Sequence, residues 1–193
     1  MGSGALWAVE IAHPGTFDAL ILFEPTLDTK TPRTEAVRSY FVASTLRRLS
    51  SWPSRAAAET YFTTAEAFAA WDREALAAHL VGALKDQADG SVSLACDPRL
   101  EASLYSMQAL DFSDEELGRP KCPIRFHWGS ESHMCFEKML KAIETKFPRI
   151  YTTRKGMPGL GHLVVMESPE QTASNIAQEL QQLEPFAQAN AKL

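Results

Sequence analysis

Residues 18–25 constrain the fold of this chain more than any other feature. They read Asp-Ala-Leu-Ile-Leu-Phe-Glu-Pro, a continuous apolar run that an acid and a proline end. A run of this length without alternation of polar residues is typical of a parallel strand that is buried on both faces. Residues 122–129 predict a second strand, which a glycine ends. The sequence therefore predicts a parallel sheet.

Helical patterns precede and follow these strands. The alanine-rich residues 4–12 predict a helix before the first strand, and residues 136–147 predict a helix after the second. A third strand is expected at residues 149–153, and Pro169 begins a last helix that extends to about Leu183. This order predicts the α/β class, as the C-terminal half of a doubly wound sheet.

A long helical segment separates the first two strands. We expect one domain over residues 1–193, with a helical lid insertion at about residues 33–115. Ser54 and Asp72 are plausible N-caps within this insertion. The segments with helical period and propensity are 34–49, 54–62, 71–84 and 100–110.

Residues 159–170 predict a loop that presents a functional histidine. They read Gly-Leu-Gly-His-Leu-Val-Val-Met-Glu-Ser-Pro-Glu, a glycine-flanked histidine followed by an apolar turn and a helix that a proline starts. An imidazole that must reach both a nucleophile and an orienting carboxylate is best placed on a loop at the carboxyl end of a sheet, where glycines let the backbone turn sharply. His162 is therefore the candidate catalytic base, and the alternative is a loop histidine with no partner.

The chain resembles the α/β-hydrolase superfamily over all of its 193 residues, and the Gly-Leu-Gly-His loop is the most specific match. The Phe-Glu-Pro strand end at residues 23–25, the Trp-Gly-Ser-Glu-Ser-His-Met segment at 128–134 and the Ala-Lys-Leu tail together resemble fungal peroxisomal hydrolases of host-selective toxin biosynthesis. That group makes epoxy-decatrienoic-acid toxin moieties. The resemblance implies a serine-hydrolase fold, a peroxisomal location and a role in a secondary-metabolite pathway.

The nucleophile that this resemblance implies is missing from the sequence. In this fold the serine precedes the acid and the histidine and lies on a strand-to-helix turn written G-x-S-x-G, and no such pentapeptide occurs. The first residues resemble the second half of that turn, so we expect the chain to begin one residue after its nucleophile. Met1 would then give its N–H to the oxyanion hole and Gly2 would close the turn. Ser3 is a poor substitute, because a serine at a helix start more often caps than attacks.

Two carboxylates are candidates for the acid that orients His162. Glu24 follows the first strand and Glu131 follows the second, and hydrolases of this fold use either location. The usual second-strand pattern is Gly-x-x-Asp, and this chain has Ser132 where the aspartate is expected. We favour Glu24, because an acid that has moved to the end of the first strand explains why Ser132 stands at the position of the usual aspartate. The alternatives are a helix-capping role for Glu24 and a solvated loop charge for Glu131.

The last three residues, Ala191, Lys192 and Leu193, predict where the protein is located. They are a close variant of the Ser-Lys-Leu peroxisomal address and follow a polar tail. An accessible C-terminus of this kind predicts recognition by the peroxisomal import receptor. The alternative is a chance match of three residues.

Composition argues against several other partners. The net charge is −5, and Lys and Arg occur in small scattered groups without an aromatic-interleaved basic face, so we expect no nucleic-acid partner. The longest apolar runs have strand length and are far too short to span a membrane. The three cysteines are unclustered, so we interpret them as thiols of a reducing compartment rather than as a nucleophile. The remaining histidines lack metal-ligand spacing, and we expect no metal and no cofactor; they are His13, His79, His127 and His133.

Two functions from different classes remain open. The first is a hydrolase that acts on a lipophilic ester or a related acyl or epoxide substrate in peroxisomes. The second is a truncated, catalytically inactive fragment or interaction module. Aromatic residues of the insertion, Trp52, Phe62, Phe68 and Trp71, would either cover a lipophilic chain or form an ordinary core.

Overall fold

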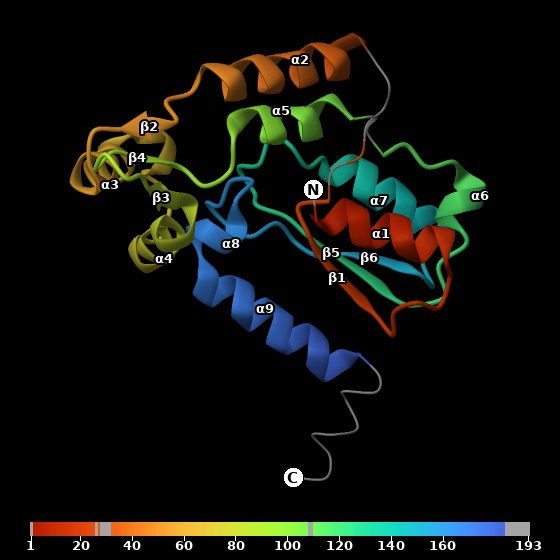
Figure 1. Cartoon of the computed structure of the whole chain (residues 1–193). Helices are drawn as coiled ribbons and strands as arrows, with labels where there is room; N and C mark the ends of the chain where they lie inside the picture. The colour runs from red at the N-terminus through yellow and green to blue at the C-terminus, as the bar shows by residue number, and fades with distance from the viewer. Residues whose placement is uncertain (1, 26, 28–31, 108–109, 184–193) are drawn as a thin grey trace. The chain divides into compact units, whose positions relative to one another are not determined.

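The computed structural model of the chain describes residues 2–25, 27, 32–107 and 110–183 (Figure 1). It divides into two compact units. The first unit consists of Met1–Leu27 and Leu110–Leu193, and the second of Asp28–Ala109. The insertion predicted at about 33–115 falls mostly in the second unit, but residues 110–115 lie in the first.

The first unit contains a parallel sheet with helices before and after its strands. Its elements are α1 (Gly2–Ala12), β1 (Leu20–Phe23), α6 (Asp114–Leu117), β5 (Ile124–His127), α7 (Glu137–Lys146), β6 (Tyr151–Thr153), α8 (Val164–Glu167) and α9 (Pro169–Gln182).

The three strands of this unit have the order β1-β5-β6, and both pairs are parallel. Leu20 is opposite Ile124, and Phe23 is opposite His127. All three strands therefore point the same way, and the loops that follow β1 and β5 leave the sheet at its carboxyl end (Figure 1). The predicted parallel sheet is confirmed.

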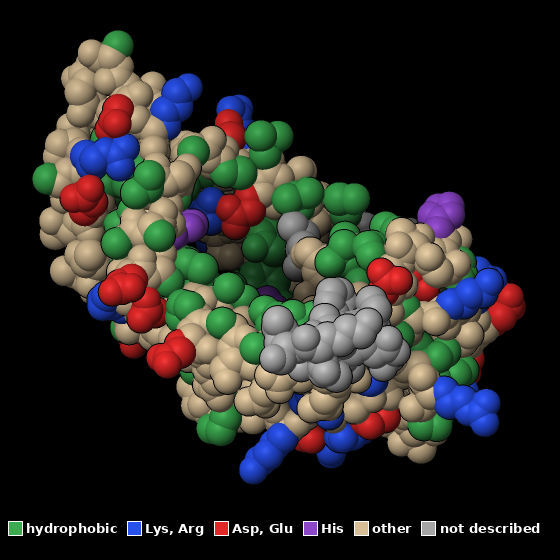
Figure 2. All heavy atoms as spheres, turned by 90° about the horizontal axis from the view of Figure 1, so that it is seen from below, with side chains coloured by type: hydrophobic (Ala, Val, Ile, Leu, Met, Phe, Trp, Pro, Cys, Tyr) green, Lys and Arg blue, Asp and Glu red, His purple; other side chains and the backbone are tan. Residues whose placement is uncertain are grey.

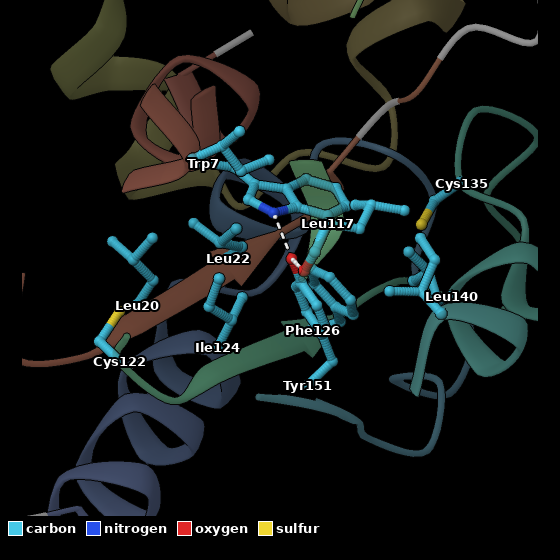
Figure 3. Packing of buried hydrophobic residues seen from close by; sticks show 12 residues of the cluster. Trp7, Leu20, Leu22, Leu117, Cys122, Ile124, Phe126, Cys135, Leu140 and Tyr151 are labelled. Carbon is cyan, nitrogen blue, oxygen red and sulfur yellow. Dashed lines mark hydrogen bonds between the residues drawn. The ribbon is translucent and has the colours of Figure 1, made fainter. Parts of the chain in front are cut away.

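One face of this sheet is apolar and packs on α1 and α7. Trp7 of α1 is fully buried against Phe126 and Tyr151, with ring centroids 5.0 and 5.7 Å away. The Trp7 indole donates to the Tyr151 hydroxyl at 3.2 Å, and that hydroxyl donates to the Leu117 carbonyl at 2.8 Å (Figure 3). The polar atoms of these large side chains are thus satisfied inside the core.

The opposite face of the same strands carries charged groups. His127 and Arg125 point there because alternate residues of a strand face opposite sides. Glu179 of α9 is 3% exposed, and its Oε1 lies 3.0 Å from Nε2 of His127. Arg154 donates to both Glu179 oxygens at 2.5 and 2.7 Å. Burial lowers the pKa of His127, against the opposing charge of Glu179, so α9 is held by a neutral imidazole and a paired carboxylate.

The second unit combines helices with a small antiparallel sheet that the sequence analysis missed. Its strands are only two or three residues long, too short for a periodic signal. Its elements are α2 (Pro32–Arg47), β2 (Ser51–Trp52), α3 (Arg55–Thr64), η1 (Glu66–Phe68), α4 (Arg73–Ala83), β3 (Leu84–Asp86), β4 (Val92–Leu94) and α5 (Pro98–Ser106), with strand order β2-β4-β3.

The aromatic residues of the insertion lie in the core of this second unit. Trp52 and Phe62 are buried, and Phe68 and Trp71 pack against the same cluster. Ser54 and Asp72 accept hydrogen bonds from the first turns of α3 and α4, as predicted for N-caps. The covering of a substrate by this unit stays a prediction.

No helix of the described residues combines the length and apolar character that a membrane crossing requires. On the face that Figure 2 shows, Lys and Arg side chains are interspersed with Asp and Glu.

Glu10 of α1 is fully buried and holds two loops of the first unit together. Its carboxylate accepts backbone N–H groups of Gly15, Thr16, Phe17 and Lys121 at 2.8–3.2 Å. Burial raises the pKa of Glu10, but the four donors outweigh it and hold the pKa below its usual value. An ionised carboxylate is therefore part of the core architecture.

Replacement of Glu10 by Gln should lower the free energy of unfolding by about 2–4 kcal/mol at neutral pH, because an amide NH₂ would face backbone donors. The stabilisation by the carboxylate is present above its unfolded pKa of 4.5 and is lost as pH falls through the lower folded value. Urea denaturation of both proteins should thus show a difference that shrinks below pH 4.5. The exposed Glu115→Gln variant is the control and should change stability by less than about 0.5 kcal/mol. A pH-independent difference would contradict the prediction.

Candidate active site

The candidate site is built around the carboxylate of Glu24, the residue that follows β1. Its side chain is 4% exposed and accepts three hydrogen bonds. The Gly129 N–H donates to Oε1 at 2.6 Å, the Ser132 hydroxyl donates to Oε2 at 2.6 Å, and Nδ1 of His162 lies 2.8 Å from Oε2. The carboxylate thus joins the ends of β1 and β5 to the histidine loop.

The backbone of Glu24 has a left-handed conformation, with φ of 51°. This conformation is unusual for a residue with a side chain and costs about 1 kcal/mol or more. It persists because its N–H donates to the His127 carbonyl at 2.8 Å while its carboxylate is held by three donors. The chain therefore leaves β1 at an angle that aims the carboxylate toward His162.

His162 lies on the loop before α8, as the sequence predicted. Its side chain is 34% exposed, and Nδ1 faces Glu24. Within the described part of the chain, Nε2 has no hydrogen-bond partner. A carboxylate on Nδ1 fixes the ring orientation and the tautomer in which Nε2 can accept a proton.

Backbone hydrogen bonds join the loop after β5 to the loop that carries His162. Met157 N donates to the Trp128 carbonyl at 2.7 Å, and Ser130 N donates to the Met157 carbonyl at 2.9 Å. Glu131 N donates to the Leu160 carbonyl at 2.9 Å, and the Ser130 hydroxyl accepts the Gly159 N–H at 2.9 Å. The loop that binds Glu24 and the loop that carries His162 are therefore joined by several hydrogen bonds.

A second carboxylate holds the backbone on both sides of His162. Glu167 of α8 accepts the Gly161 N–H at 2.6 Å and the Leu163 N–H at 3.1 Å. A side chain at Gly161 would meet the Glu167 carboxylate at 3.0 Å, so the small residue permits this contact. Glu167 acts on the position of His162 through the backbone.

The two candidate acids have different surroundings. Glu24 is buried and contacts His162, whereas Glu131 is exposed, and its carboxylate accepts only the Ser130 hydroxyl at 3.2 Å among the described residues. The structure thus brings Glu24, and not Glu131, to the histidine. Burial and the charge of Glu24 also raise the pKa of the neighbouring Cys135 thiol to about 12, so this cysteine stays protonated.

The predicted remnant of the nucleophile turn is only partly described. Met1 lies outside the described residues, as do Ala191, Lys192 and Leu193. Gly2 begins α1, and a Cβ added there would meet nothing within 4 Å. The Ser3 hydroxyl donates to the Phe23 carbonyl at 2.6 Å, which puts the start of α1 beside the carboxyl end of β1.

A small cavity of about 130 Å³ lies beside the histidine. His162 and Glu24 provide its polar side. The remaining lining is apolar and comes from the end of β1 and from α8 with its preceding residue: Phe23, Leu163, Val164, Val165 and Met166. Within the described residues no group of three or more His, Cys, Asp or Glu could hold a metal ion.

Sequence reasoning did not assign roles to Gly129, Ser132 and Glu167. Ser132 gave a signal, because it replaces an expected aspartate. Gly129 ends a predicted strand, but its contact with Glu24 spans 105 positions and has no local signature. Glu167 lies five residues after His162, just before the helix that Pro169 begins. Acidic residues are common near helix starts, so its sequence position did not indicate a contact with the histidine loop.

Replacement of Gly129 by Ala should separate the two joined loops. A Cβ at this position would lie 2.2 Å from the Gly161 carbonyl oxygen and 2.3 Å from that of Leu160, and neither backbone can yield cheaply. We expect the free energy of unfolding to fall by about 2–4 kcal/mol in urea denaturation. Gly82→Ala is the control, because a Cβ there meets nothing within 4 Å and helix propensity favours alanine. A Gly129→Ala protein as stable as the control would contradict the loop packing.

The sequence matches no protein-family model and no curated protein. Its fold resembles several solved structures. The peroxisomal α/β-hydrolase Lpx1 of Saccharomyces cerevisiae matches with a TM-score of 0.72 at 17% identity, over 93% of this chain and 50% of that protein. E-2-(acetamidomethylene)succinate hydrolase matches with a TM-score of 0.68 at 15% identity, over 92% of this chain and 62% of that one.

An esterase of Mycobacterium tuberculosis, Rv0045c, gives a third match, with a TM-score of 0.61 at 13% identity, over 93% of this chain and 57% of the esterase. The chain therefore spans about half to three fifths of the length of these hydrolases. The chain has an α/β-hydrolase fold.

Proposed function

We propose that His162 and Glu24 are the general base and the orienting acid of a serine-hydrolase site. The observation that carries this proposal is the 2.8 Å contact of His162 Nδ1 with a buried carboxylate at the carboxyl end of a parallel sheet. Glu24 stabilises the imidazolium that forms when Nε2 takes a proton from a nucleophile. His162 then returns this proton to the leaving group.

We propose that the nucleophile belongs to a segment that directly precedes α1. The start of α1 adjoins the carboxyl end of β1, where Glu24 lies, and a helix N-terminus favours a developing oxyanion. Ser3 is a weak candidate because its hydroxyl is committed to the Phe23 carbonyl. Met1 would contribute the N–H of the oxyanion hole and Gly2 would close the turn.

The proposed substrate is a lipophilic ester or a related acyl or epoxide compound. The cavity beside His162 supports this class, because every lining residue other than His162 and Glu24 is apolar. A hydrocarbon part would lie against Phe23 and Met166 while the reacting bond faces the imidazole.

We also propose a peroxisomal location and a role in fungal toxin or secondary-metabolite biosynthesis. The location is supported by the Ala-Lys-Leu tail and by the likeness in fold to a peroxisomal hydrolase. The pathway draws on the resemblance in sequence alone. A non-catalytic role remains the alternative, since no described hydroxyl or thiol contacts Nε2 of His162.

The test of the activity is to express the chain together with the residues that its transcript encodes upstream of Met1. Such a protein should hydrolyse p-nitrophenyl esters and react with a fluorophosphonate probe. Glu24→Gln should lower kcat/KM by about 10³–10⁴-fold, because the imidazolium and its tautomer lose their partner. His162→Ala should lower it at least as far.

Glu131→Gln is the matched control and should keep kcat/KM within about twofold, since Glu131 is exposed and does not contact the histidine. A large loss of kcat/KM in Glu131→Gln, with none in Glu24→Gln, would assign the role of the orienting acid to Glu131 instead. A folded protein with an upstream stop codon and no labelling would support the non-catalytic alternative.

A fluorescent reporter that ends in residues 184–193 should accumulate in peroxisomes. The address is read by an import receptor that needs the terminal carboxylate and side chain of Leu193. The same reporter without Leu193 is the control and should remain in the cytosol. If the reporter that carries all of residues 184–193 stayed in the cytosol, the proposed peroxisomal location would be contradicted.

A further inference from the structure

We propose that Ser132 is a positioning residue that sets the Glu24 carboxylate against His162. This inference rests on the proposed roles of Glu24 and His162. The Ser132 hydroxyl donates to Oε2 of Glu24 at 2.6 Å, the same oxygen that faces Nδ1 of His162 at 2.8 Å. Ser132 is thus one hydrogen bond removed from the proposed base.

The proton of the Ser132 hydroxyl has a fixed direction. Its oxygen accepts the backbone N–H groups of Met134 at 3.2 Å and Cys135 at 3.4 Å. A hydroxyl has one proton and two lone pairs, so two incoming N–H donors leave the proton free to point only at the carboxylate. The Ser132 backbone itself is anchored, because its N–H donates to the Gly129 carbonyl at 2.9 Å.

Two anchors then fix the rotation of the Glu24 carboxyl group. Gly129 N holds Oε1 and Ser132 holds Oε2, and both belong to the loop after β5. With only the Gly129 contact, the carboxyl group could turn about its last bond and move Oε2 away from the imidazole. The hydroxyl prevents this movement and keeps a lone pair of Oε2 aimed at Nδ1.

This role also gives a physical reason for the serine at position 132. An aspartate there would place a second carboxylate against the buried oxygen of Glu24, and two such charges in contact repel each other. A serine provides a donor of the right length without a charge. Glu24 after β1 and Ser132 after β5 are therefore complementary, as a carboxylate acceptor and an uncharged hydroxyl donor.

The test measures the His162–Glu24 hydrogen bond directly. The 193-residue chain is labelled with ¹⁵N at histidine, and the proton on Nδ1 of His162 is observed by NMR. A His162→Asn variant, which lacks this proton, assigns the signal. We expect a low-field proton that exchanges slowly with water. Ser132→Ala should remove this signal or speed its exchange about tenfold or more, because the carboxylate loses a donor that fixes it.

Three further variants separate positioning from a general effect on folding. Ser132→Thr keeps the hydroxyl and should keep the slow proton. Ser132→Cys keeps the side-chain size with a weaker donor and should give intermediate exchange, which decides the question if the alanine variant is unfolded. Ser130→Ala is the matched control: it removes a hydroxyl of the same loop that contacts Glu131 and Gly159 but not Glu24, and its exchange should stay within about twofold of the parent.

Glu24→Gln distinguishes failure of this inference from failure of the proposed function. Loss of the slow proton in Glu24→Gln, with the signal unchanged in both Ser132→Ala and Ser132→Cys, would overturn the role of Ser132 and leave the base–acid pair intact. A parent protein without the signal, or a Glu24→Gln protein that retains it, would overturn the pair and this inference together.

Discussion

The buried carboxylate of Glu24 is the interaction on which the site depends. It accepts hydrogen bonds from the loop after β5 and contacts the histidine loop, while Glu24 itself directly follows β1. A φ of 51° is energetically costly for a residue with a side chain. These contacts therefore outweigh the intrinsic backbone preference of Glu24. One carboxylate thus fixes the relation of three segments that are distant in the chain.

The rest of the first unit supports this carboxylate from both faces of the sheet. On one face, Trp7 and Tyr151 belong to a large apolar core, and the polar atoms of these two side chains both have partners. On the other face, Glu179 of α9 binds His127, whose carbonyl accepts the Glu24 N–H. These contacts on both faces hold the end of β1, and with it the Glu24 carboxylate, in place.

The loop after β5 has a wider role than a connection between a strand and a helix. Because Gly129 has no side chain, the backbone of the histidine loop can lie directly against it. The Gly129 N–H and the Ser132 hydroxyl both donate to the Glu24 carboxylate. The Glu24 carboxylate and the His162 ring are therefore both held by these two joined loops. Glu167 fixes the remaining freedom of the His162 backbone.

The sequence by itself predicted the parallel sheet and its three strands, and it placed His162 on a glycine-flanked loop, because strand-length runs and glycine turns are local signals. It also limited the candidate carboxylate partners of His162 to Glu24 and Glu131. Tertiary structure alone decided which carboxylate meets the imidazole, since the contact joins residues 138 positions apart. The short strands of the second unit and the contact of Ser132 with Glu24 were likewise decided by tertiary structure. Strand pairing and a side-chain hydrogen bond between distant loops depend on partners that no local pattern contains.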